Sequence, residues 1–139
     1  MNPASLPPKT PEPPTAIAGF DVAQAVDRML GQPTLWFDAL HLFVQHFANW
    51  ESDWENAQGD DSAERRCVHA LRSGAANVGA NQLSAVAAVL EELLARRCVG
   101  QTEVIPESAR IYLKDCFRED WQAAADACRF SPQVNGTAL

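Results

Sequence analysis

His69 lies among arginines at spacings that suit chemistry on an anion. Arg65 and Arg66 precede it by four and three residues, and Arg72 follows it by three. Residues three or four apart on an α-helix share one face, so these side chains would surround the imidazole. A neutral imidazole nitrogen can attack phosphorus without a dedicated base, and Arg72 can compensate the charge of phosphoryl oxygens. The pattern predicts a phosphate-accepting histidine.

This chemistry requires an exposed histidine, and the helix expected from about Ser62 to Asn77 would provide it. Its buried stripe is expected to consist of Cys67, Leu71, Ala75 and Val78. His69 is two residues from Cys67 and from Leu71, so it is rotated by about 200° from each and should face solvent.

Small residues follow the histidine, which would leave it open to a folded donor domain. Ser73, Gly74 and Ala76 belong to this surface, and Val78-Gly79-Ala80 forms a tight corner. A glycine inside a helix costs about 1 kcal/mol relative to alanine, so Gly74 requires a reason, either access to the histidine or close helix packing. We include Arg65, Arg66, Ser73, Gly74, Ala76 and Gly79 among the candidate binding residues. The two arginines are either solvated charges or groups that steer an acidic partner.

The surrounding sequence predicts further helices. A short one should run from Val22 to Leu30, with Asp21 as its cap, Gln24 returning a bond to that cap, and Gly31 as its stop. The next begins near Pro33 and carries large apolar residues at steps of three and four, which we interpret as core rather than a ligand-stacking surface: Trp36, Leu40, Phe43, Phe47, Trp50 and Trp54. Two more are expected over about 81–97 and 106–127.

These elements predict an all-α fold, because no segment alternates apolar with polar residues over the length of a strand. Four long helices with short connections pack most simply as an antiparallel up-down-up-down bundle, with the short N-terminal helix covering one end. The domain should span residues 19–130. Residues 1–16 hold six of the nine prolines, so we expect a disordered tail or linker over 1–18 and a second disordered tail over 131–139.

Composition restricts the partners. A formal net charge of −7 argues against nucleic acid. No apolar run is long enough to cross a membrane, so we expect no membrane contact by this chain. We also expect a monomer, and the cysteine pattern described next indicates a cytoplasmic compartment. The cysteines form no Cys-x-x-Cys pair and should be reduced core residues: Cys67, Cys98, Cys116 and Cys128.

The remaining polar candidates have structural explanations. His41 and His46 are five residues apart, which does not align them for metal binding, so we expect partly buried, hydrogen-bonded histidines, with His46 near a partner surface. Asp60, Asp61 and Glu64 are interpreted as charges at a helix N-terminus rather than as catalytic acids. No metal site is predicted.

The segment from His69 to Ala80, HALRSGAANVGA, followed by Leu83 and the pair Leu90-Glu91, carries a resemblance. It is similar to the signature of the histidine-containing phosphotransfer (Hpt) domain family: histidine, any residue, leucine, lysine or arginine, glycine, several small residues, then glycine-alanine and a leucine-glutamate pair. The resemblance covers about residues 19–128.

This resemblance implies that His69 accepts a phosphoryl group from an aspartate of a receiver domain and passes it to another. The receiver would belong to a response regulator or a hybrid sensor kinase, and it would hold Mg²⁺. The chain itself would need no cofactor. It would be a stoichiometric phosphocarrier without kinase activity, either free-standing or part of a larger protein.

Two positions depart from the family pattern. Ser73 occupies the place of the usual glycine, where its hydroxyl would either hydrogen-bond the phosphoryl group or hinder docking. The residue 22 positions after the histidine hydrogen-bonds the ring in family members and is often glutamine. Here it is Glu91, which would orient the ring, unless it is an ordinary solvated glutamate.

Two other functions compete with a phosphocarrier. A pseudo-Hpt module would dock a receiver domain or kinase and regulate it by occupancy alone. A helical adaptor would use the bundle for binding, with His69 incidental.

Overall fold

The computed structural model describes residues 12–129, and helices dominate this part of the chain. They are α1 (Val22–Arg28), α2 (Pro33–His46), α3 (Trp50–Ala57), α4 (Asp61–Val78), α5 (Asn81–Cys98) and α6 (Glu107–Cys128). Within these residues no strand forms, and an isolated bridge joins Ile17 to Phe20. The all-α prediction is confirmed.

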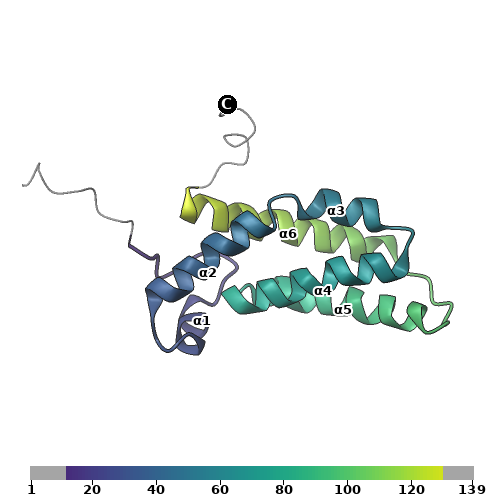
Figure 1. Ribbon diagram of the computed structural model, residues 1–139, viewed down its shortest axis with the longest axis horizontal. Coiled ribbons are helices and arrows are strands. Elements are labelled where there is room, and N and C mark those ends of the chain that lie inside the picture. The colour runs from purple at the N-terminus through teal and green to yellow at the C-terminus, as the bar shows by residue number, and fades with distance from the viewer. Residues whose placement is uncertain (1–11, 130–139) are drawn as a thin grey trace, which may run out of the picture.

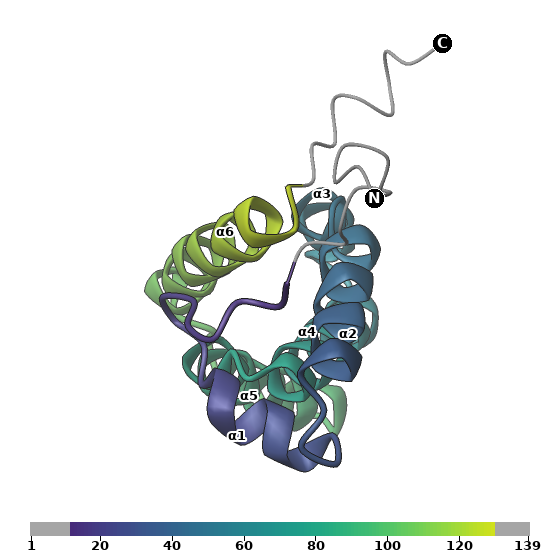
Figure 2. The same ribbon diagram turned by 90° about the vertical axis from the view of Figure 1, so that its left-hand side faces the viewer.

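The long helices form four arms around one apolar core, and Figures 1 and 2 show how these arms are arranged. One arm consists of α2 followed by α3, the others are α4, α5 and α6, and α1 lies at one end. In Figure 1 the chain runs in opposite directions along successive arms. Only Gly79 and Ala80 separate α4 from α5, so these two helices form a tight antiparallel hairpin.

The aromatic helix expected to continue from Pro33 past Trp54 is interrupted at residues 47–49, so that prediction of continuity is wrong. All six residues of the predicted stripe are nevertheless buried, which confirms their place in the core. At this interruption, two aromatic residues contact α4. The ring of Phe47 packs on Gly74, and the indole of Trp50 donates a hydrogen bond to the carbonyl of Cys67 at 2.8 Å. We call residues 46–50 the elbow.

The cap of α1 differs in part from the prediction. The Asp21 carboxylate accepts a hydrogen bond from the backbone N–H of Gln24, as expected. The backbone N–H of Asp21, however, donates to the carbonyl of Gly79 at 2.8 Å, and the Gln24 side chain accepts from Asn81 instead of returning to the cap. The expected reciprocal bond is therefore replaced by two bonds that tie α1 to the corner between α4 and α5.

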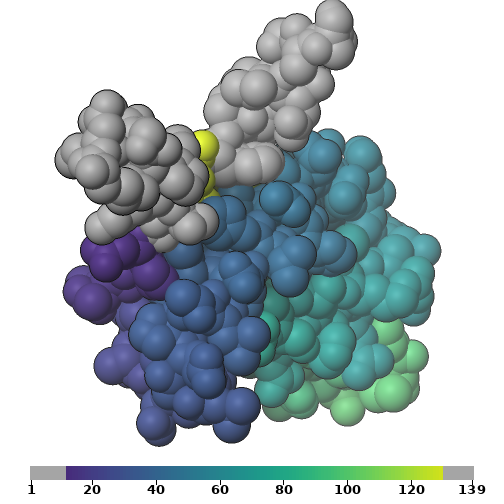
Figure 3. All heavy atoms as spheres, turned by 60° about the vertical axis from the view of Figure 1, so that its left-hand side comes forward, coloured from purple at the N-terminus to yellow at the C-terminus, as the bar shows by residue number. Residues whose placement is uncertain are grey.

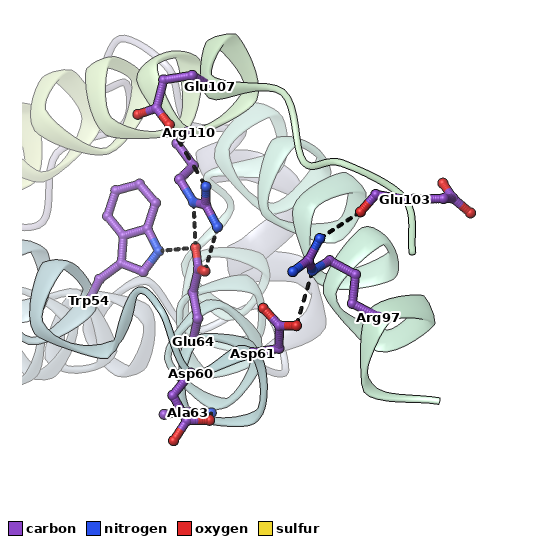
Figure 4. Close-up of polar contacts among 9 residues, drawn as sticks. All are labelled: Trp54, Asp60, Asp61, Ala63, Glu64, Arg97, Glu103, Glu107 and Arg110. Atoms are coloured by element: carbon purple, nitrogen blue, oxygen red, sulfur yellow. Dashed lines mark hydrogen bonds and ion pairs between the residues drawn. The ribbon is translucent and has the colours of Figure 1, made fainter. Parts of the chain in front are cut away.

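The start of α4 contains a buried ion pair that the sequence did not predict. Asp60 caps the helix by accepting from the backbone N–H of Ala63, as expected of a helix N-terminal charge. Glu64 is instead fully buried, and its carboxylate accepts two hydrogen bonds from Arg110 and one from the indole of Trp54 (Figure 4). A buried carboxylate is stable only with hydrogen-bond donors or a positive charge beside it. Here the donors come from α3 and α6, so the cluster joins these two helices to α4.

The cysteines do not all lie in the core. Cys67, Cys116 and Cys128 are half-buried, and all four thiols are free. Cys98 is exposed, which contradicts its predicted burial. It is the last residue of α5, where the helix reaches the surface loop before α6.

Most of the predicted tail sequence lies outside the described residues, including all of 131–139 and residues 1–11 of the tail expected over 1–18. Within the described part, Ile17 packs against the core. No helix in residues 12–129 is long and apolar enough to cross a membrane.

Candidate functional site

His69 lies near the middle of α4, with 61% of its side chain exposed. The buried positions of this helix include Val68, Leu71, Ala75 and Val78, while Cys67 is only half-buried. Val68 therefore takes the place in the core that we expected for Cys67. The prediction that His69 faces solvent is confirmed, because the buried residues Val68 and Leu71 place the opposite face of α4 against the core. Part of the α4 surface lies open beside α2 and α3 (Figure 3).

Glu91 of α5 bonds the imidazole. Its Oε2 lies 2.7 Å from Nδ1 of His69, and its Oε1 accepts a hydrogen bond from Arg72 at 3.0 Å. The carboxylate side chain is only 10% exposed. Burial acts to raise the pKa of Glu91, but the hydrogen bonds from Arg72 and His69 outweigh burial and lower that pKa below its ordinary value. Glu91 is therefore a carboxylate, and the alternative of a solvated surface glutamate does not fit.

This contact determines which ring nitrogen is free. A carboxylate can only accept hydrogen bonds, so Nδ1 must carry the proton that it shares with Glu91. A neutral ring protonated on Nδ1 has its lone pair on Nε2. No described residue bonds Nε2. The arrangement presents a nucleophilic nitrogen on an exposed ring whose orientation is fixed by a buried group.

Arg72 is half-exposed, and part of its guanidinium is engaged by Glu91. Arginine has five N–H donors, so other donors remain for an anion near the ring. Glu91 thus links the predicted phosphoacceptor to the predicted charge-compensating arginine.

Arg65 and Arg66 are exposed and line a surface depression of about 300 Å³ next to the histidine. We call it the arginine hollow. Its lining consists of Ser62, Arg65, Arg66, His69 and Glu91. The sequence analysis did not consider Ser62, although its spacing of four from Arg66 and seven from His69 places it on the same helix face. Its hydroxyl accepts a hydrogen bond from Arg66 at 3.0 Å.

The small residues after His69 have different environments. Ser73 is exposed on α4. A Cβ on Gly74 would lie 2.5 Å from Cε2 of the buried Phe47 ring, so close packing against the elbow explains this glycine. Ala76 is half-buried, and its carbonyl accepts a hydrogen bond from Arg28.

Gly79 is buried at the corner after α4 rather than on the histidine surface. Its φ of +92° is left-handed, and a Cβ there would lie 2.7 Å from the carbonyl oxygen of Asp21. These two constraints make Gly79 a structural residue of the corner.

The other histidines lie on α2. His41 is half-buried, and its Nδ1 is 2.9 Å from the carbonyl of Phe37, as expected for a hydrogen-bonded structural histidine. His46 is exposed and packs edge-on against Phe47, with no hydrogen bond to a described residue, so the prediction of a partly buried, hydrogen-bonded histidine is wrong for His46. It borders a groove of about 190 Å³ between α2 and α4 that also includes Gly74 and Asn77. In the described part of the chain, no three His, Cys, Asp or Glu side chains are grouped to hold a metal ion.

The family model described as Hpt domain matches residues 37–127. No curated protein and no solved structure matches the chain. The matched region includes His69, Arg72 and Glu91. Hpt domains are helical phosphotransfer modules of two-component signalling that interact with receiver domains. Because the match covers more than half of the chain, this protein belongs to the Hpt domain family.

Proposed function

We propose that this protein is a phosphocarrier of a multistep phosphorelay, which accepts a phosphoryl group on Nε2 of His69 and passes it to another receiver domain. The observation that carries this proposal is the pairing of an exposed ring with a buried carboxylate. The 2.7 Å contact from Nδ1 to Glu91 leaves the lone pair on Nε2, the ring nitrogen open to an approaching domain.

The transfer needs no separate base. Nε2 attacks the phosphorus of an aspartyl phosphate, the Nε2–P bond forms, and the P–O bond breaks with its electron pair leaving on the aspartate carboxylate. The Nδ1 proton stays in the hydrogen bond to Glu91, so the ring becomes positively charged beside a carboxylate. This electrostatic compensation supports both acceptance and release. In this proposal Mg²⁺ belongs to the receiver.

Arg72 would act on the transferred group through the donors that Glu91 does not use. Its exposure suits this task, because 48% of the Arg72 side chain is open to solvent and to an approaching phosphoryl group.

The test uses a panel of receiver domains phosphorylated on aspartate with radiolabelled acetyl phosphate and then desalted. Each is mixed with the wild-type chain, His69→Gln and His41→Gln, and label on the chain is followed together with its acid lability. His41 is the matched control, because it is a histidine of α2 outside the arginine hollow. Acid-labile label on wild type and His41→Gln but not on His69→Gln is the expected result.

Other results would favour the competing functions. Label that persists on His69→Gln would refute the assignment of the phosphoacceptor. Binding to a receiver without any label on the wild-type chain would favour a pseudo-Hpt docking module. Neither binding nor label across the panel would favour the helical adaptor.

A further inference from the structure

Among the described residues, two arginines that precede His69, Arg65 and Arg66, lack the carboxylate partners that the other cations of α2 to α6 have. Arg65 and Arg66 form no ion pair with any residue of the described range. Every other lysine or arginine on α2 to α6 pairs with a carboxylate: Arg72, Arg96, Arg97, Arg110, Lys114 and Arg118. In a chain with a formal net charge of −7, two adjacent uncompensated arginines form a local site of attraction for anions.

These arginines also converge on a place where an anion can be held. Both line the arginine hollow, whose volume of about 300 Å³ is at the small end of the range for ligand pockets. They lie four and three residues before His69, within one turn of α4, so their long side chains can reach the space beside the ring. Ser62 adds a hydroxyl that is already bonded to Arg66.

The negative groups nearby do not cancel this charge. Glu91 is on the wall of the hollow, but its two oxygens are taken by His69 and Arg72. Asp53 lines a second depression together with Arg66, yet the two form none of the ion pairs found among the described residues. Arginine presents paired N–H groups that match phosphoryl oxygens, and an exposed pair of arginines favours a doubly charged oxyanion.

We propose that Arg65, Arg66 and Ser62 form a subsite for a phosphoryl oxyanion, through which a small phosphoramidate phosphorylates His69 without a receiver domain. The inference rests on the proposed role of His69. It adds the two arginines before the histidine to the contacts proposed for Arg72, one of whose N–H groups is engaged by Glu91.

The reaction balances without a further reactant. Nε2 attacks the phosphorus of phosphoramidate protonated on nitrogen, and the Nε2–P bond forms as the P–N bond breaks. The electron pair of the broken bond leaves on nitrogen as ammonia. The Nδ1 proton remains in the hydrogen bond to Glu91.

The experiment measures the rate of an 80 Da mass increase on the intact chain at several phosphoramidate concentrations. The test variant is Arg65→Gln/Arg66→Gln. The matched control is Arg96→Gln/Arg129→Gln, which removes the same charge from exposed positions outside the hollow. All four arginines are exposed, so both variants should retain the helical circular dichroism of wild type.

We expect wild type and control to be labelled with saturable kinetics, and the test variant to be labelled about tenfold more slowly because it lacks two oxyanion donors. Inorganic phosphate should slow labelling of wild type more than chloride at equal ionic strength. Equal rates for the test variant and wild type, or a rate linear in donor without competition by phosphate, would overturn the subsite.

A parallel measurement with a phosphorylated receiver domain distinguishes a failure of this inference from a failure of the proposed function. If a phosphorylated receiver labels wild type but phosphoramidate does not, the subsite is refuted and the carrier function stands. If phosphoramidate labels His69→Gln as fast as wild type, both the subsite and the phosphoacceptor assignment fail.

Discussion

Replacing Asp120 by asparagine should change stability by an amount that depends on pH. Asp120 of α6 is 7% exposed, and its Oδ2 is buried without a hydrogen-bond partner in the described part of the chain. Burial, followed by the charge of Glu119, raises the pKa of Asp120 from 3.8 to about 6. The folded state therefore keeps a proton that the unfolded state releases, so stability is lost as pH rises from about 4 to about 6. A shift of roughly two units corresponds to about 3 kcal/mol at neutral pH.

The assay is urea denaturation of wild type and Asp120→Asn at pH 4.5 and pH 7.5. The amide of the variant leaves a buried N–H unpaired, at a cost of about 1–3 kcal/mol that does not vary with pH. The informative quantity is the change in the stability difference between the two pH values. Relative to wild type, the free energy of unfolding of Asp120→Asn should be about 2 kcal/mol higher at pH 7.5 than at pH 4.5.

Asp115→Asn is the matched control, because Asp115 is an exposed aspartate of the same helix. Its difference from wild type should remain nearly constant with pH. If the Asp120→Asn difference is equally constant, the carboxyl is not held protonated by its surroundings and the reasoning is wrong.

Three further substitutions test the site and the contacts that position it. Glu91→Gln should slow transfer from a phosphorylated receiver about fivefold, since a neutral acceptor is about 1 kcal/mol weaker than a carboxylate, and an unchanged rate in a rapid-quench assay would argue against charge compensation. Gly74→Ala should lower the free energy of unfolding by about 1 kcal/mol, because the clash with Phe47 exceeds the gain in helix propensity, and increased stability in urea would contradict this packing. Glu64→Gln should destabilise the bundle by about 3 kcal/mol, because Arg110 would lose its buried carboxylate partner and keep only the 3.8 Å contact with the exposed Glu107, and a melting temperature equal to that of wild type would refute that account.

The features predicted well from the sequence were those set by local spacing. The exposure of His69 follows from its two-residue offset from Leu71, and the corner at Gly79 follows from a glycine after a helical stretch. The ring contact with Glu91 spans 22 residues and came from the family resemblance, since no helical periodicity connects residues on different helices.

The errors arose where a contact from another helix decided the local structure. The aromatic stripe keeps its helical phase through the elbow, so periodicity alone could not reveal the interruption, where Phe47 packs on Gly74 of α4. Glu64 has the spacing of a helix N-terminal charge, but Arg110, 46 residues later, determines its burial. Cys98 is four residues after the buried Leu94, yet the helix ends at Cys98, at the surface and directly after two arginines.

Ser73 and Gly74, which follow Arg72, are both small residues near the histidine, but they have different environments. Gly74 faces the elbow, and its lack of a side chain is needed within the molecule, because Phe47 occupies the space of a Cβ. Ser73 faces solvent, so the bundle places no comparable restriction on its size. A glycine at the usual family position would therefore not relieve packing in this protein. Under the proposed function, the exposed Ser73 side chain would therefore meet a partner that approaches His69 rather than another part of the bundle.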